Sequence, residues 1–168
     1  MAFGDKPFGL KDVKLTPIGG GTQVDLPSVQ RLSFTERTIS GELRGDDSLV
    51  SVVGIAEAVD WELEAGGISL EAYALMTGRT ISASGTTPNQ SKTLTGQAGK
   101  HYPYFKVFGK SVGDASTDDV HVLLHKCKLT EISGEFADGE FFVTSCQGIA
   151  IDDGTNGIFD IVQNETAD

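Results

Sequence analysis

Two long stretches of the chain, VQRLSFTERTISGELR and LVSVVGIAEAVDWELE, alternate in polarity and are separated only by Gly45, Asp46, Asp47 and Ser48. Alternation with a period of two is typical of β-strands. Two aspartates between glycine and serine suit a two-residue turn. The pattern predicts a long β-hairpin that turns at Asp46 and Asp47 and projects from the domain.

The apolar side of this hairpin changes along its length. Near the open end the apolar face carries Leu32, Phe34, Val59, Trp61 and Leu63, and the opposite face carries Arg31, Ser33, Asp60, Glu62 and Glu64. Toward the turn, the formerly acidic side carries Ile39, Leu43, Val50 and Val52. One core cannot cover both apolar sides, so we expect this hairpin tip to contact another subunit. A bulge near Gly45 or Gly54 would shift the faces by one residue and remove the exchange.

A second hairpin is predicted around Asp138-Gly139, a pair that favours a type I′ turn. It places Ile132, Phe136, Phe141, Val143 and Ile149 on one face, and Glu131, Ser133, Glu135 and Thr144 on the other. If the two hairpins align in one sheet, their carboxylates form one continuous negative surface: Asp60, Glu62, Glu64, Glu131 and Glu135.

Twenty-one glycines among segments rich in Val, Ile, Thr and Phe indicate a mainly β chain of short strands and tight turns. One helix is expected at about 69–77, with Ser69 as N-cap and Gly78 closing the end. Its apolar residues Leu70, Tyr73, Ala74 and Met76 either pack across an open end of the sheets or belong to a surface loop.

The length of 168 residues suits one domain. We divide it into residues 1–27, an arm or a first strand, a β domain at 28–165, and a tail at 166–168. The longest candidate loop, 83–100, is a contact arm or a mobile tip.

The charge balance restricts the possible functions. With 24 acidic and 13 basic residues the formal charge is −11, which disfavours proteins that grip nucleic acid through phosphate contacts. No signal peptide or membrane span is visible, so we expect a soluble protein. The two cysteines, Cys127 and Cys146, are expected to be free thiols.

Candidate chemical sites are weak. The sequence Arg44-Gly45-Asp46 is interpreted as a turn rather than an adhesion motif, and the adjacent Asp46 and Asp47 are too solvated for acid-base chemistry. On the strand VHVLLHKCK, His121, Leu123, His125 and Cys127 fall on one side, but collinear ligands do not surround a metal. We therefore predict a structural role for them, no metal site, no cofactor and no catalytic residues.

A monomeric binding module remains an alternative of a different class. A β-sandwich that presents an acidic cleft can bind a sugar or a calcium ion, and the oxygen ligands would be Asp46, Asp47, Asp152 and Asp153. An enzyme is the third class.

A series of segments in order, ELRGDD, WELEAGGISLEAYALMTG, SGTTPN, PYFKVFG, DVHVLLHKCKLT, GEFADGEFFVTSCQG and GIFDIV, resembles the major tail tube proteins of long-tailed non-contractile (siphovirus-type) bacteriophages. The resemblance covers most of residues 28–165. It implies an antiparallel β-sandwich or barrel-like pair of sheets with one flanking helix. Tail terminators and hubs have related subunits and remain alternatives.

The same resemblance implies a structural virion protein that forms stacked hexameric rings. The implied partners are further copies of the chain, the tape measure protein, the tail terminator and the tail-tip proteins. Assembly would occur in the bacterial host cytoplasm, and the product would be the virion tail, without membrane contact. Double-stranded DNA would pass through a lumen lined by Asp60, Glu62, Glu64, Glu131 and Glu135, because carboxylates do not hold phosphates.

Overall fold

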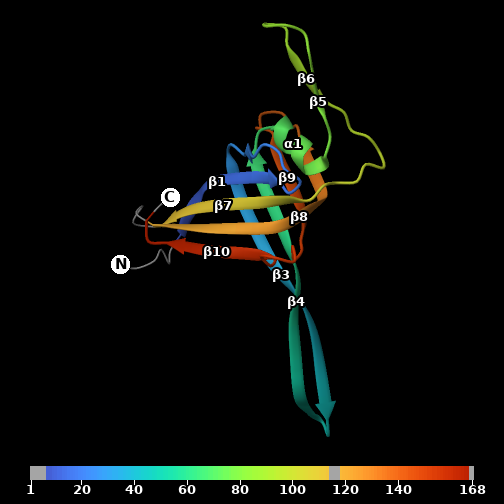
Figure 1. The fold of residues 1–168 in the computed structure, drawn as a ribbon, viewed down its shortest axis with the longest axis vertical. Helices are drawn as coiled ribbons and strands as arrows, with labels where there is room; N and C mark the ends of the chain where they lie inside the picture. Colours follow the sequence, from blue (N-terminus) through green and yellow to red (C-terminus); the bar gives the residue numbers. More distant parts are fainter. Residues whose placement is uncertain (1–6, 114–117, 167–168) are drawn as a thin grey trace.

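The chain folds into antiparallel β-structure with one short helix, which confirms the predicted fold class (Figure 1). The computed structural model describes residues 7–113 and 118–166. Its elements are β1 (Pro7–Pro17), β2 (Val24–Asp25), β3 (Val29–Gly45), β4 (Ser48–Gly66), α1 (Leu70–Thr77), β5 (Ile81–Ser84), β6 (Ser91–Leu94), β7 (Phe105–Gly113), β8 (Asp119–Glu135), β9 (Val143–Ala150) and β10 (Phe159–Asn164).

The main sheet has the strand order β2-β1-β7-β8-β9-β4-β3, with β10 also paired to β8. Strand β8 is shared, because its residues 119–124 pair with β7 and β10 whereas residues 127–135 pair with β9. The sheet therefore folds over into two layers. The first layer holds β2, β1, β7, the start of β8 and β10; the second holds the end of β8, β9, β4 and β3, whose strands run across the first (Figure 1).

The core fills the space between these layers. The first layer contributes Val13, Leu15, Phe105, Val107 and Leu124, and the second contributes Val59, Trp61, Leu63, Leu129 and Ala150, all of them buried. The Trp61 ring meets Phe105 edge to face with centroids 5.7 Å apart, a favourable aromatic geometry. Trp61, which the sequence placed on the apolar face of the first hairpin, is therefore a core residue.

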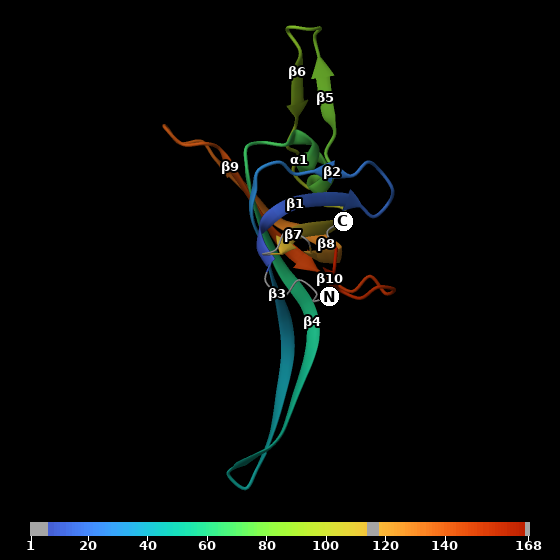
Figure 2. The same cartoon turned by 90° about the vertical axis from the view of Figure 1, so that its left-hand side faces the viewer.

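Helix α1 lies across one open end of the sandwich (Figure 2). Of the two predicted alternatives, packing across the sheets and a surface loop, the first is therefore the one observed. The Ser69 hydroxyl accepts a hydrogen bond from the Ala72 amide at 3.3 Å, and Gly78 ends the helix with φ 66°. Of the predicted packing residues, Met76 is buried, whereas Leu70, Tyr73 and Ala74 are only half-buried; Ala72, which was not predicted, is buried as well.

The sequence left two alternatives each for residues 1–27 and for the candidate loop 83–100. Residues 7–17 form β1 in the interior of the first layer, so this part of the N-terminal segment is a strand; residues 1–6 lie outside the described part. The candidate loop 83–100 contains most of a small hairpin, in which β5 pairs with β6. Figure 2 shows this hairpin projecting beyond α1. The predicted tail at 166–168 is described only at Thr166.

The two cysteines are free and buried. Cys127 pairs with Ala150, four positions from Cys146 on β9, so the register keeps the two thiols apart. Burial raises the pKa of Cys146 to about 12 and also raises the pKa of Cys127. Within residues 7–113 and 118–166, we find no helix with the length and apolar character needed to cross a bilayer.

The contact between Trp61 and β9 leads to a prediction about stability. A methyl group added at Gly148 would lie 2.6 Å from Cζ2 of Trp61 and would also strike the Lys128 carbonyl oxygen. We expect Gly148→Ala to lower the free energy of unfolding by about 1–3 kcal/mol, as overpacking does. Urea unfolding followed by Trp61 fluorescence measures the change. The matched control is Gly41→Ala, where the new methyl group meets nothing within 4 Å; equal stability of the two variants would contradict the packing described.

Candidate assembly surfaces

The distal halves of β3 and β4 leave the body as a two-stranded arm, residues 38–56 (Figure 1). Asp46 and Asp47 form its turn with φ values of 47° and 62°, both in the left-handed region that a type I′ turn requires. Arg44 donates to the Glu42 carboxylate at 3.1 Å. The turn at Asp46-Asp47 is confirmed, and the RGD tripeptide belongs to this turn.

Bulges in β4 set which arm residues share a face. Arg37 pairs with Ala58 and Thr38 pairs with Ala56, so Glu57 is an extra residue that shifts the alternation of β4 by one position. Ile39 then pairs with Ile55 and Gly41 with Val53, and directly opposed residues lie on the same side of a sheet. The arm apolar face is defined by Ile39, Leu43, Val53 and Ile55.

The predicted exchange of faces is therefore right for one strand and wrong for the other. Ile39 and Leu43 on β3 do continue the side that carries Asp60 and Glu62. Val52 instead pairs with Glu42 on the opposite side, and Val50 is the extra residue of a second bulge near the turn. The prediction assumed that side chains alternate along β4 without interruption. The two bulges shift this alternation, so Val53 and Ile55 lie where Val50 and Val52 were expected.

The arm exposes apolar side chains that its own body does not cover. The exposed fractions are 56% for Ile39, 62% for Leu43, 53% for Val53 and 61% for Ile55. Val50 and Val52 are equally exposed. A two-stranded hairpin has little stability in water without a packing partner, and contiguous exposed apolar residues mark interaction surfaces. The arm is therefore a candidate subunit contact.

The five predicted acidic residues lie on one face of the second layer. Along β4, Asp60, Glu62 and Glu64 alternate with the buried Val59, Trp61 and Leu63. Glu62 and Glu131 pair with the same residue, Gln147, from opposite sides of β9. Glu64 pairs with Ser145 and Glu135 with Val143, which share this side of β9. We call this outward side of β8, β9, β4 and β3 the acidic face.

Details of the second predicted hairpin require correction. The turn does include Asp138 and Gly139, but Gly139 alone has positive φ, at 81°, so it is not type I′. The strands stop at Glu135 and Val143, and the register changes near Thr130. Thr144 is consequently buried on the Ile132 side, and Val143 and Ile149 lie on the acidic face. Phe136 and Phe141 lie in the loop and are 82% and 97% exposed.

The acidic face also carries cations. Arg31 approaches Glu62 at 3.4 Å and Arg37 approaches Asp60 at 2.6 Å. Lys128 shares the face because it pairs with Ile149, whose other neighbour is Asp60. Gln147 donates to Glu131 at 2.9 Å. Among the described residues, Glu64, Glu131 and Glu135 have no salt bridge, so their charges dominate the field of this face.

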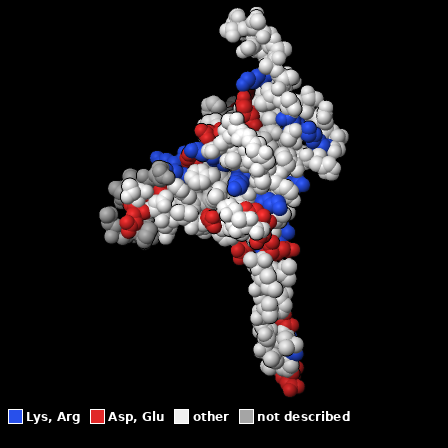
Figure 3. Space-filling model, in the orientation of Figure 1, with Lys and Arg blue, Asp and Glu red and all other residues white. Residues whose placement is uncertain are grey.

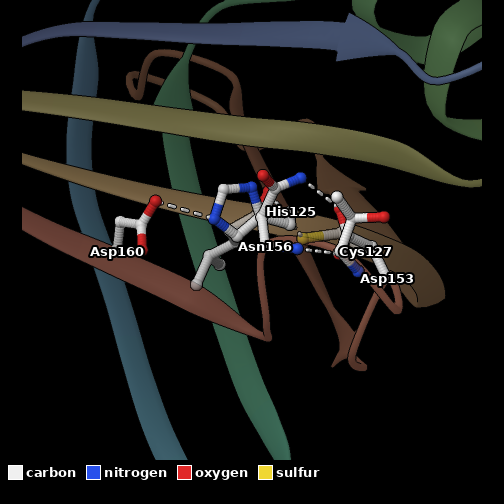
Figure 4. A network of polar contacts seen from close by, with 7 residues as sticks. His125, Cys127, Asp153, Asn156 and Asp160 are labelled. Carbon is white, nitrogen blue, oxygen red and sulfur yellow. Dashed lines mark hydrogen bonds and ion pairs between the residues drawn. The ribbon is translucent and has the colours of Figure 1, made fainter.

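The histidines and the cysteine of β8 do not share one side, contrary to the sequence prediction. The pairing with β7 changes register between Leu124 and Cys127, so Cys127 turns into the core whereas His121 and Leu123 lie on the outer side. His125 is buried and its Nε2 lies 2.9 Å from Asp160 (Figure 4). In the described part of the chain, no group of three or more His, Cys, Asp or Glu residues is arranged to hold a metal ion.

The four aspartates of the calcium-module alternative do not come together. Asp46 and Asp47 lie at the arm tip, whereas Asp152 and Asp153 lie in the loop between β9 and β10. Asp153 accepts hydrogen bonds from the amides of Asn156 and Thr155 and from the Asn156 side chain (Figure 4). These bonds, those of Asn156 first, hold the pKa of Asp153 well below its ordinary value. Its oxygens therefore shape the loop.

A surface that the sequence did not reveal lies at the pole opposite the arm. Here α1 leaves a cleft over the end of the second layer, which we call the α1 cleft, lined by Leu26, Leu63, Ile68, Tyr73, Met76 and Cys146 among others. Its lining comes from separate parts of the chain, so no local motif marks it. The surrounding segment, residues 68–104, is basic, and this charge is the feature of the sequence that could have indicated the surface.

Comparisons with known proteins add little to this geometry. No protein-family model matches the chain, and none of the curated proteins matches its sequence. Among solved structures, a chain in the 6-fold symmetrised cryo-EM structure of the anti-feeding prophage baseplate is similar over 90% of this chain and 91% of that chain, with a TM-score of 0.49 and 11% identity.

The exposed arm leads to a prediction about self-association. Leu43→Asp places a charge on the arm apolar face, and we expect it to shift the sedimentation velocity distribution to smaller species than the wild type forms, because an unpaired charge is costly to bury. The urea midpoint should stay unchanged, since Leu43 is 62% exposed in the single chain. The control is Leu43→Met, which keeps the apolar surface. If the aspartate variant associated as strongly as the wild type, the arm would not be part of the subunit contact.

Proposed function

We propose that this chain is the major tail tube subunit of a long-tailed bacteriophage and forms stacked hexameric rings around a negatively charged lumen. One observation carries the proposal: the acidic face belongs to a four-stranded layer that is open at both edges. The sequence resemblance to tail tube proteins agrees with this geometry. No catalytic residue has a part in this function.

The open edges favour closure into a ring of identical copies. On one side β3 pairs only with β4, and on the other side residues 128–135 of β8 pair only with β9, within the described chain. Neighbouring strands of this layer all run antiparallel. The two edge strands therefore run in opposite directions, so β3 of one copy can pair antiparallel with β8 of an identically oriented copy.

Charge complementarity supports that seam. Outward residues of the β3 edge include Arg31 and Arg37, and outward residues of the β8 edge include Glu131 and Glu135. Joining the edges brings guanidinium groups toward carboxylates that have no salt bridge within the described chain. Opposite charges on adjacent strands stabilise the pairing. A ring thus completes both the hydrogen bonding of the sheet and the charge pairing of its edges.

Repeating the layer around a ring places the acidic face on the inner wall. Asp60, Glu62, Glu64, Glu131 and Glu135 then line the lumen, and the carboxylates repel DNA phosphates. Double-stranded DNA would pass without specific binding during ejection. The protein would assemble in the bacterial host cytoplasm and reside in the virion tail, with the tape measure, tail terminator and tail-tip proteins as further partners.

Negative-stain electron microscopy of the purified protein tests the proposal. Hollow tubes built of stacked rings are expected at high protein concentration, and added salt should favour them by screening repulsion between carboxylates. Isolated rings that never stack would instead point to a tail terminator or hub. Single particles at every concentration and salt level would contradict self-assembly.

The inner-wall assignment leads to its own prediction. Glu64→Lys reverses a charge of the acidic face on the interior strand β4, away from the proposed seam and without altering a buried contact, so tubes should still form. The reversed wall should retain DNA in gel electrophoresis at 0.01 M salt and release it at 0.15 M, where the Debye length falls from about 30 Å to about 8 Å. The Glu64→Gln tube is the neutral control. Reversed tubes that bind no DNA at either salt concentration would place the face outside the lumen.

A further inference from the structure

We propose that the loop between β8 and β9 of one copy docks into a groove beside β3 of a second copy, and that Phe136 is the side chain that enters the groove. The loop, residues 136–142, is called the aromatic loop. The groove lies between β1 and the start of β3 and is called the β3 groove. The inference rests on the proposed function, because it requires the seam between β8 and β3, and it names the side chains that hold that seam.

The aromatic loop carries phenylalanine rings that the body of the chain does not cover. Phe136 is 82% exposed and Phe141 is 97% exposed. Phe136 lies against Phe142, with ring centroids 4.5 Å apart. Phe142 in turn lies over Gly134, because a methyl group added there would strike its ring. Exposed aromatic rings of this kind are typical of the anchors that a partner protein buries.

The rings of Phe136 and Phe142 lie on the core side of the second layer. Gly134 pairs with Thr144, and directly opposed residues share a side of the sheet. Thr144 is buried, on the side of Ile132, so the ring that covers Gly134 is on that side too. A second copy that extended the sheet at β8 would present its own core side to these rings.

The β3 groove opens on the corresponding side of the opposite edge. Val29 pairs with Ala65, which is buried, so the start of β3 turns its apolar side chain toward the core side. The volume of the groove is about 560 Å³, which lies within the range of roughly 300–1,000 Å³ for pockets that enclose small molecules. It therefore has room for an aromatic ring. Its apolar lining consists of Leu10, Val13, Leu26, Pro27 and Val29.

The loop and the groove lie at the same level of the second layer. Glu135 at the end of β8 pairs with Val143, and Val143 pairs with Gly66. The Gly66 amide donates to the Ser28 carbonyl oxygen at 2.8 Å, so one row of residues crosses the layer from the end of β8 to the start of β3. When identical copies join without stagger, the end of β8 in one copy meets Ser28 of the next. Phe136 follows at once in the chain, and Ser28 lines the β3 groove.

The charges beside the ring and the groove are complementary. Lys11 lines the groove and has no salt bridge within the described chain. The carboxylates of the groove are Asp12, which contacts Lys14 at 2.9 Å, and Asp25, which pairs with Lys14 across β1 and β2. Figure 3 shows basic atoms gathered over β1 and β7. Opposite charges orient two partners as they meet. The aromatic loop and the residue before it supply three carboxylates, Glu135, Asp138 and Glu140.

Cross-linking of the assembled full-length protein tests the docking. Ala137→Cys in the aromatic loop and Asp25→Cys at the groove are combined in one chain; the native thiols, Cys127 and Cys146, are buried and react slowly. A short bismaleimide should join each copy to the next, and denaturing electrophoresis should show a ladder of multimers that ends at the ring size. Each single-cysteine variant is a matched control and should remain monomeric on the gel.

Replacement of the ring gives an independent measurement. Phe136→Ser should raise the protein concentration needed for assembly about tenfold or more, as the loss of an aromatic hot spot does. Its urea midpoint should stay unchanged, because Phe136 is 82% exposed in the single chain. The matched control is Phe141→Ser, which removes an equally exposed ring of the same loop that has no ring contact within the described chain. This control should assemble like the wild type.

Three cross-linking results would overturn the docking: a cross-link within one chain, a ladder longer than the ring, which places the contact between rings, and tubes that give no ladder. The last result leaves the tube function intact. Equal assembly defects in Phe136→Ser and Phe141→Ser would also contradict the docking, since they show no special part for Phe136. A complete ladder from closed rings that never stack would instead support the docking and reject the tube.

Discussion

Strand β4 buries Val59, Trp61 and Leu63 between the two layers, and this packing fixes where its intervening carboxylates lie. Because strand side chains alternate, Asp60, Glu62 and Glu64 must then face outward. The neighbours of β4 continue the same division: β9 buries Cys146 and Ala150, and β3 presents Arg31 and Arg37 to the acidic side. The position of the Trp61 ring against Phe105 and Gly148 therefore determines which surface is charged.

Features that depend on local chemistry could be predicted from the sequence. The turn at Asp46-Asp47, the helix between Ser69 and Gly78, and the acidic residues that alternate with core residues all follow from neighbouring side chains. A bulge near Gly54 was considered from the sequence, but its position at Glu57 could not be predicted, because nothing in the local pattern requires an extra residue there. Its effect was to exchange Val52 for Val53 on the arm apolar face. The α1 cleft was also missed, since distant segments form it.

The single chain leaves two kinds of interaction incomplete. The second layer has unpaired edges at β3 and at the end of β8, and the arm has an apolar face without a core. Exposed edges and apolar arms are hazards for a protein that stays monomeric. In a tube the edges would close a ring, and the arm would contact another subunit. The open edges and the exposed arm both support the proposed self-assembly.

The most direct test of this account is a cryo-EM reconstruction of the assembled protein at a resolution that separates strands. The account predicts a ring in which β3 of each copy pairs antiparallel with β8 of its neighbour, with Glu64 and Glu131 on the inner wall. A reconstruction with these residues on the outer surface, or with both edge strands unpaired, would contradict it.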